Sequence, residues 1–336
     1  IAKDWIGNNN KELRITFLTA YLFYPEGDTI QKQKYYQELL DYTSADYESS
    51  MRQNALENML VIDPKNLEVL YNLVNATTHH KWQFVKFGRD TIRELLKKEG
   101  YKIMLKPHVW KRHGSFTGHH GYTSEKDWKA FETSYSNYIL TFAQLAQKEK
   151  VELFCIGTEW AKFVEERPEY WKKLINEVKK VYFGKLTYAA NWDEYKKVTF
   201  WNQLDYIGVD AYFPLVDDKT PSSAQVKYAL LNPLNELRIV SSSNNKPILF
   251  TEFGYRSVDN TAHQPWEAGR EGIVNLQAQL NAYEAFFESF WSQSFISGGF
   301  IWKWFADHEN VGGENNNGFT PQNKPVEKLI QKWYSF

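Results

Sequence analysis

Short apolar runs alternate with stretches of helical periodicity over residues 88–336. Two of these runs, residues 154–158 and 247–251, contain β-branched or aromatic residues and have Gly or Pro near their edges, which is typical of buried strands. Each run leads into a glutamate, Glu159 or Glu252, that directly follows a threonine. An ionised side chain inside a buried parallel strand is costly. We therefore expect both carboxylates at the carboxyl ends of their strands, where α/β folds keep their chemistry.

A structural salt bridge is the alternative for either glutamate taken alone. Because the same Thr-Glu ending occurs on two separate predicted strands, the pattern favours a carboxylate pair in one site.

The same alternation predicts the other elements of the chain. Strands are expected at about residues 102–110, 186–192, 206–214 and 298–304, and helices at about 90–100, 124–145, 169–182, 222–238, 270–292 and 325–335. Six strands thus fall within 88–336. Residues 14–25 also fit a strand, and residues 67–74 fit either a strand or a short helix. Two strands from residues 1–85 would complete a (β/α)₈ TIM barrel, so we expect one α/β domain over residues 1–336.

An open, doubly wound sheet is the alternative architecture. It is disfavoured because no Gly-rich phosphate-binding loop follows any predicted strand. Polar or aromatic residues instead end nearly every predicted strand, as expected for a barrel rim around one central site. These residues are His108, Glu159, Asn191, Tyr212, Glu252 and Trp304.

Composition narrows the class of protein further. The 40 basic and 41 acidic residues give a net charge of −1, which argues against a nucleic-acid partner. No run of 18 apolar residues occurs, so no membrane span is expected. Cys155, the single cysteine, lies inside a predicted strand and is expected in the core; one cysteine excludes an intrachain disulfide and a Cys-based zinc site. The 13 tryptophans provide flat apolar faces that can stack on sugar rings.

Location is weakly constrained by the sequence. The chain starts at Ile1 and shows no signal peptide. If an export signal was removed, the protein is secreted, periplasmic or at the cell surface; a cytoplasmic location stays open.

A pair of glutamates facing each other across a barrel mouth can cleave a glycosidic bond. One carboxyl must be protonated to donate to the leaving oxygen, and the other must be ionised to attack the anomeric carbon or activate water. Other chemistries find less support. The pairs His79-His80 and His119-His120 lack metal-site spacing, residues 312–318 lack calcium-loop spacing, and no Gly-x-Ser-x-Gly elbow occurs. We expect no metal and no cofactor.

Six segments, taken together and in order, resemble glycoside hydrolase family 113, the β-mannanases of the large retaining (β/α)₈ clan. They are residues 105–110, 156–159, 186–192, 207–214, 249–255 and 318–321, and the resemblance covers about residues 85–336. Many members of the wider clan have Asn before the acid/base residue, where this chain has Thr158; family 113 itself has Gly-Thr-Glu. The first two strands of the family are not clearly recognisable in residues 1–85.

The resemblance implies roles for individual residues. Glu159 would be the acid/base, Glu252 the nucleophile, and Tyr212 the residue that holds the nucleophile by a hydrogen bond. Sugar subsites would be lined by Lys106, His108, Asn191 and Asp210, with stacking faces from Trp110, Trp192, Trp302 and Trp304.

The expected activity is hydrolysis of β-1,4-mannosidic linkages in mannan or manno-oligosaccharides by a retaining double displacement. The partner is then a β-linked polysaccharide or oligosaccharide. Two alternatives stay open: the same mechanism on another β-glycan, and a non-catalytic carbohydrate-binding protein with a hydrolase-like groove.

Overall fold

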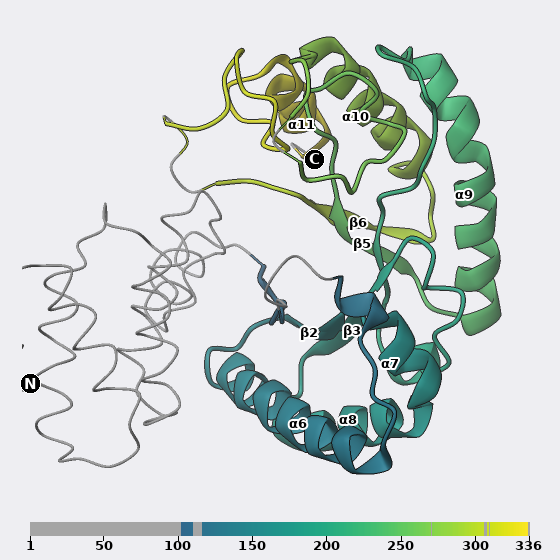
Figure 1. Ribbon diagram of the computed structural model, residues 1–336, viewed down its shortest axis with the longest axis vertical. Coiled ribbons are helices and arrows are strands. Elements are labelled where there is room, and N and C mark those ends of the chain that lie inside the picture. The colour runs from purple at the N-terminus through teal and green to yellow at the C-terminus, as the bar shows by residue number, and fades with distance from the viewer. Residues whose placement is uncertain (1–101, 110–115, 270, 306–307, 309, 335–336) are drawn as a thin grey trace, which may run out of the picture. The chain divides into compact units, whose positions relative to one another are not determined.

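Six strands form one parallel sheet in the described part of the chain, in the order β1–β2–β3–β4–β5–β6 (Figure 1). The computed structural model describes residues 102–109, 116–269, 271–305, 308 and 310–334. The strands expected within residues 1–85, the helix expected at 90–100 and Trp110 lie outside these residues. The strands are β1 Met104–Leu105, β2 Leu153–Thr158, β3 Lys185–Asn191, β4 Ile207–Asp210, β5 Ile248–Phe253 and β6 Ile296–Ile301.

Helices lie along the outer side of the curled sheet (Figure 1). They connect successive parallel strands, as an α/β fold requires. The helix α6 Glu125–Lys148 joins β1 to β2, α7 Ala161–Glu166 and α8 Pro168–Val181 join β2 to β3, α9 Ser223–Asn244 joins β4 to β5, α10 Leu276–Phe290 joins β5 to β6, and α11 Pro325–Tyr334 follows β6. The short 3₁₀ helices η3 Thr117–His119 and η4 Trp201–Gln203 precede α6 and link β3 to β4. The described residues therefore form a curled, six-stranded parallel half-barrel.

Local sequence explains where the long helices begin. Ser124 caps α6, and its hydroxyl accepts a hydrogen bond from the backbone N–H of Asp127 at 3.1 Å. At α9, Ser222 and Gln225 form a full capping box, which satisfies two free N–H groups of the first turn. The α9 helix continues to Asn244, beyond the predicted end near 238, and Asn245 then adopts the left-handed conformation common after helices.

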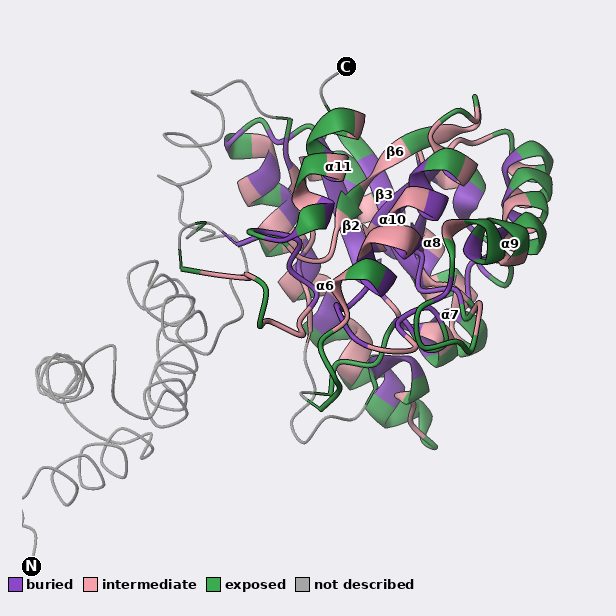
Figure 2. Ribbon diagram, turned by 90° about the horizontal axis from the view of Figure 1, so that it is seen from above, coloured by how far each residue is buried: buried purple, intermediate pink, exposed green. Residues whose placement is uncertain are grey.

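Aromatic side chains fill the space between the sheet and the helices. Phe253 of β5 stacks on Phe286 of α10 with ring centroids 4.4 Å apart, and Trp171 of α8 stacks on Phe200 at 5.7 Å. Strands β2 and β3 are largely buried, whereas the outer face of α9 is exposed (Figure 2). Each buried ring contributes about 1.5–3 kcal/mol by leaving water, so much of the aromatic content stabilises the core. Cys155 is also buried in the core, as predicted.

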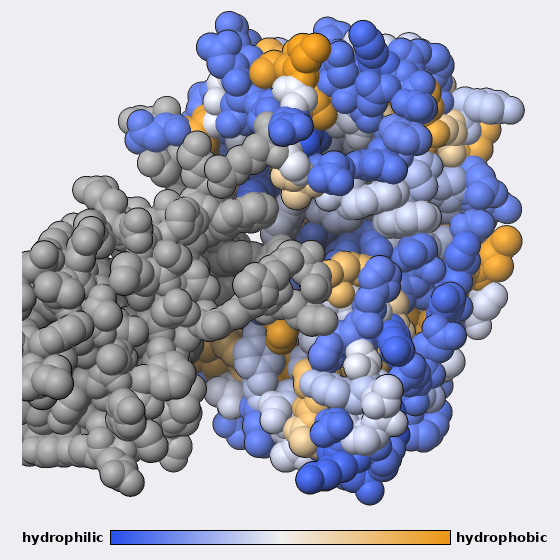
Figure 3. Space-filling model, viewed as in Figure 1, coloured by the Kyte–Doolittle hydropathy of each residue, from blue (hydrophilic) through white to orange (hydrophobic). Residues whose placement is uncertain are grey.

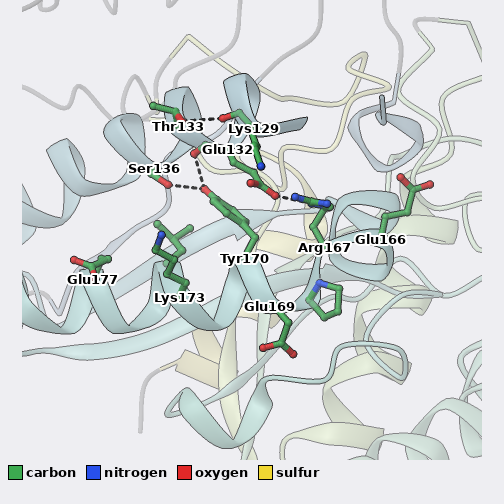
Figure 4. Close-up of a pocket in the computed structure, with 12 residues that line it drawn as sticks. Lys129, Glu132, Thr133, Ser136, Glu166, Arg167, Glu169, Tyr170, Lys173 and Glu177 are labelled. Carbon is green, nitrogen blue, oxygen red and sulfur yellow. Dashed lines mark hydrogen bonds and ion pairs between the residues drawn. The ribbon is translucent and has the colours of Figure 1, made fainter. Parts of the chain in front are cut away.

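The surface of the described region is mainly hydrophilic on the face shown in Figure 3. A groove lies between α6 and the α7–α8 segment, where ion pairs and hydrogen bonds cross-link the helices (Figure 4). Arg167 donates to Glu132 at 2.6 Å, and the Tyr170 and Ser136 hydroxyls lie 2.9 Å apart. None of the predicted site residues lines this groove.

The six strands predicted within residues 88–336 are confirmed, with changes at their ends. The strand expected at 102–110 is reduced to the two residues of β1, and the helix expected at 169–182 is α8, with the separate helix α7 before it. No described helix has the length and apolar character to cross a membrane.

Candidate active site

Polar side chains gather at the carboxyl ends of the strands. Asn191 ends β3 and pairs in register with Asp210, which ends β4 and in turn pairs with Glu252 in β5. Glu159 follows β2 directly, and its backbone N–H donates to the Ala189 carbonyl of β3 at 2.8 Å. The two glutamates are thus at the same edge of the sheet, as the strand endings predicted.

Lys106, which follows β1, joins two of these carboxylates. Its ammonium lies 3.1 Å from both oxygens of Asp210 and 2.6 Å from Oε1 of Glu252. The three side chains are only 11%, 0% and 12% exposed, so each charge depends on the others for compensation. Burial lowers the pKa of Lys106, but the neighbouring Asp210 and Glu252 outweigh it and raise this pKa above its usual value. The lysine therefore stays charged.

Glu252 is held as an anion. Its second oxygen accepts a hydrogen bond from the Tyr212 hydroxyl at 2.8 Å, which is the contact expected of Tyr212 from the sequence. Burial acts to raise the pKa of Glu252, but the charge of Lys106 and the hydrogen bonds from Lys106 and Tyr212 lower it below its usual value. The Phe319 ring packs edge-on against Tyr212, with centroids 6.4 Å apart, and so connects the segment 318–321 to the site.

Asp210 is completely buried, which argues against the direct contact with sugar that was expected of it. Besides the Lys106 ammonium, Oδ1 accepts a hydrogen bond from the Thr251 hydroxyl at 2.7 Å. Burial, with the nearby charge of Glu252, raises the pKa of Asp210 to about 7. These contacts favour a role in holding Lys106 rather than in binding a substrate hydroxyl.

Glu159 has the opposite electrostatic setting to Glu252. Its backbone adopts a left-handed φ of 53°, which is uncommon for a residue with a side chain and typical of functional sites. Burial, and then the negative charges of Asp210 and Glu252, raise the pKa of Glu159 well above its usual value, while Lys106 opposes them. Of the two glutamates, Glu159 is therefore the one whose surroundings favour the protonated carboxyl.

His108 and Asn191 are neutral polar groups near the carboxylates. Burial lowers the pKa of His108 to about 4, so the imidazole is uncharged at neutral pH. The Asn191 side-chain oxygen accepts from the backbone N–H of Trp192 at 2.9 Å, which fixes the orientation of the amide. Neutral donors and acceptors of this kind suit the hydroxyl groups of a sugar.

The predicted tryptophans occupy different settings. Trp192 stacks face to face on Trp266, with centroids 5.4 Å apart, and Trp266 is 40% exposed. Trp302, directly after β6, is half-buried, and Trp304 is 44% exposed. The approach of Trp302 to β5 requires a glycine there, because a Cβ on Gly254 would lie 2.1 Å from the Trp302 carbonyl oxygen.

Four residues at the site were not singled out from the sequence: Glu194, Thr251, Trp266 and Lys303. The repeated Thr-Glu ending could have drawn attention to Thr251. The two threonines of that pattern, Thr158 and Thr251, nevertheless make different contacts. The Thr251 hydroxyl donates to Asp210, whereas the buried Thr158 hydroxyl has no hydrogen-bond partner among the described residues. Lys303 lies with its ammonium 5.2 Å from the ring centroids of both Trp302 and Phe305, and burial lowers its pKa to about 7.

The arrangement separates the protonation states of two carboxyl groups at one sheet edge. Glu159 favours the acid and Glu252 the anion, which is the pairing that cleavage of a glycosidic bond needs.

Residues 79–324 match the model of Glycoside Hydrolase Family 113. With its parallel α/β fold and its carboxylate pair, the protein is a glycoside hydrolase, and its substrate is a glycan. More specifically, the chain belongs to glycoside hydrolase family 113.

Solved structures of the same family are similar to this chain. A GH113 β-1,4-mannanase, solved as a complex, shares 27% identity and a TM-score of 0.63, covering 80% of this chain and 79% of its own. The GH113 β-mannanase from Alicyclobacillus acidocaldarius, in complex with ManMIm, shares 26% identity and a TM-score of 0.65, covering 74% and 78%. Comparison with curated protein sequences gives no match.

Proposed function

We propose that this protein hydrolyses β-1,4-mannosidic linkages in mannan or manno-oligosaccharides by a retaining double displacement on a (β/α)₈ barrel. The observation that carries the proposal is the opposite electrostatic environment of the two glutamates. Lys106 and Tyr212 stabilise Glu252 as an anion, whereas burial among carboxylates keeps Glu159 protonated. The similarity to two β-mannanase structures supports mannan as the substrate.

In the first step, Glu252 attacks the anomeric carbon while Glu159 donates its proton to the leaving oxygen. The bond to the leaving oxygen breaks as the glycosyl ester of Glu252 forms. Loss of its proton leaves Glu159 as an anion, which can then deprotonate a water molecule. That water attacks the anomeric carbon, the ester bond breaks, and both glutamates return to their starting states.

Other residues take supporting roles in this proposal. Lys106 and Tyr212 keep Glu252 ionised, and Asp210 holds Lys106 in place. Substrate contacts are assigned to His108 and Asn191 and to the tryptophan faces, for which the candidates are Trp110, Trp192, Trp302 and Trp304.

Proton NMR of mannohexaose with the purified protein tests both the substrate and the stereochemistry. The β-anomer of the new reducing end should form before mutarotation. The α-anomer first would keep the substrate and overturn Glu252 as nucleophile. If mannohexaose is not cleaved, mannan is not the substrate. Assays on other β-glycans, with binding measured in parallel, then separate a different hydrolase from a carbohydrate-binding protein.

A further inference from the structure

A buried carboxyl group lies close to Glu159 but outside the carboxylate pair. Glu194 follows β3, is 2% exposed, and accepts hydrogen bonds on both of its oxygens. The Tyr188 hydroxyl donates to Oε1 at 2.6 Å, and the Asn191 backbone N–H donates to Oε2 at 3.1 Å. A buried carboxyl is costly, and the reaction proposed above gives this one no role.

The hydroxyl of Tyr188 connects Glu194 to the backbone beside Glu159. Tyr188 lies within β3 with no exposed surface, and its oxygen accepts a hydrogen bond from the Trp160 backbone N–H at 2.7 Å. Trp160 is the residue directly after Glu159 and precedes the first residue of α7. Because Glu194 accepts the hydroxyl proton of Tyr188, a lone pair of that hydroxyl is left for the Trp160 N–H.

The backbone at Glu159 needs such support. Its φ of 53° is unfavourable for a residue with a Cβ, and the pairing of β2 with β3 shifts register between Cys155 and Thr158, just before it. The Glu159 N–H is bound by the Ala189 carbonyl, and the next N–H is bound by Tyr188. Both of these hydrogen bonds come from β3, so β3 fixes the peptide units on either side of the Glu159 Cα.

We propose that Tyr188 and Glu194 are positioning residues for the acid/base Glu159. The pair fixes the peptide that follows Glu159, and so aims the carboxyl at the leaving oxygen. The inference rests on the function proposed above. Around Glu159, the charged and titratable groups include Lys106 after β1, Glu194 after β3, Asp210 in β4, Tyr212 after β4 and Glu252 in β5. Glu194 is the one among them with a hydrogen-bonded connection to the backbone beside Glu159.

The test compares two substrates that differ only in how much they need the acid. Phenyl β-mannobioside has a poor leaving group that requires protonation, whereas 2,4-dinitrophenolate leaves without it. For Tyr188→Phe and Glu194→Gln, kcat/KM on the phenyl substrate should fall about 10–100-fold, as expected for a misplaced general acid. On the dinitrophenyl substrate it should fall less than about 3-fold.

Tyr182→Phe is the matched control. Tyr182 is a buried tyrosine whose hydroxyl donates to the Val151 carbonyl at 2.9 Å, at the opposite end of β2 from Glu159. Its loss should change kcat/KM on both substrates by the same factor. Equal losses on both substrates for Tyr188→Phe and Glu194→Gln would overturn the proposal. If Tyr188→Phe does not fold, the ratio of the two kcat/KM losses in the isosteric Glu194→Gln variant tests the proposal by itself. Failure of the proposed function is distinguishable, because the unaltered protein would then cleave neither mannobioside.

Discussion

The Lys106 ammonium lies 2.6 Å from Glu252, although three strands separate β1 from β5 in the sheet. Four steps of about 4.8 Å would place the ends of β1 and β5 roughly 19 Å apart in a flat sheet, which no lysine side chain can span. The curl of the half-barrel therefore brings the two charges together. The hydrogen bond in turn links the end of the first described strand to the fifth, so the site depends on the curl of the sheet.

Glu252→Gln should abolish hydrolysis while the fold persists. An amide cannot attack the anomeric carbon, and we expect kcat to fall at least roughly 10³-fold. Turnover of manno-oligosaccharides, measured beside circular dichroism, checks this result. Glu169→Gln, at a side chain that is 81% exposed, is the control and should retain full activity. A Glu252→Gln enzyme with substantial activity would show that another group is the nucleophile.

Lys106→Met should move the acid limb of the kcat/KM profile to higher pH. Removing the ammonium removes the main charge that lowers the pKa of Glu252, so a higher pH is needed to ionise this proposed nucleophile. An opposite charge at this distance shifts a pKa by roughly 1–3 units, and the limb should move accordingly. Tyr212→Phe should move it in the same direction by less.

The control for this experiment is Lys172→Met, which removes an exposed lysine paired with Glu169 on the surface. Its pH profile should match that of the unaltered enzyme. An acid limb that stays in place in Lys106→Met would mean that Lys106 does not set the ionisation of the nucleophile.

Glu159→Gln should stabilise the protein, increasingly so at higher pH. The folded-state pKa of Glu159 lies above its unfolded value of about 4.3, so the folded state binds more protons than the unfolded state in the range between these values. Stability from this group is therefore lost as pH rises through that range, and a neutral amide avoids the loss. Thermal unfolding from pH 4 to pH 8 measures the difference. Glu165→Gln, at a 66% exposed position, should show no such trend.

Gly254→Ala should lower both stability and activity. The added Cβ would lie 2.1 Å from the Trp302 carbonyl oxygen, so either β5 or the segment after β6 must move. Overpacking of this kind costs about 1–3 kcal/mol, and the displaced Trp302 ring should raise KM for oligosaccharides. Gly269→Ala is the matched control, because among the described residues its Cβ would meet the Glu267 side chain alone, at 3.1 Å. Equal unfolding temperatures for the two variants would contradict the packing argument.

The sequence could predict those parts of the structure that depend on residues close together along the chain. Continuous apolar runs identified β2 and β5, and their endings placed Glu159 and Glu252 at the same edge of the sheet. Ser124 marked the start of α6 through local capping. The strand predicted at 102–110 was too long, because Met104 and Leu105 are the residues that pair with β2 and the polar Lys106 and then Pro107 follow them.

The contacts between distant residues could not be predicted in this way. Lys106 meets Asp210 and Glu252 across 104 and 146 residues of chain, and only the curl of the sheet decides that they touch. Glu194 gave no signal, because its neighbours in sequence do not reveal that both its oxygens are bound inside the protein. Trp266 likewise gave no signal, because nothing near it in the sequence reveals that its ring stacks on Trp192.

The contact of Lys106 with two carboxylates has a consequence for the course of the proposed reaction. Glu252 loses its negative charge when it becomes an ester in the glycosyl-enzyme. Asp210 then remains as a counter-ion 3.1 Å from the same ammonium. The charge of Glu252 also contributes to the raised pKa of Asp210, so its disappearance makes Asp210 a more stable anion when Lys106 depends on it. In the proposed cycle, Asp210 thus remains as the counter-ion of Lys106 while Glu252 is an ester. The charge of the buried lysine is therefore compensated both before and after the glycosyl-enzyme forms.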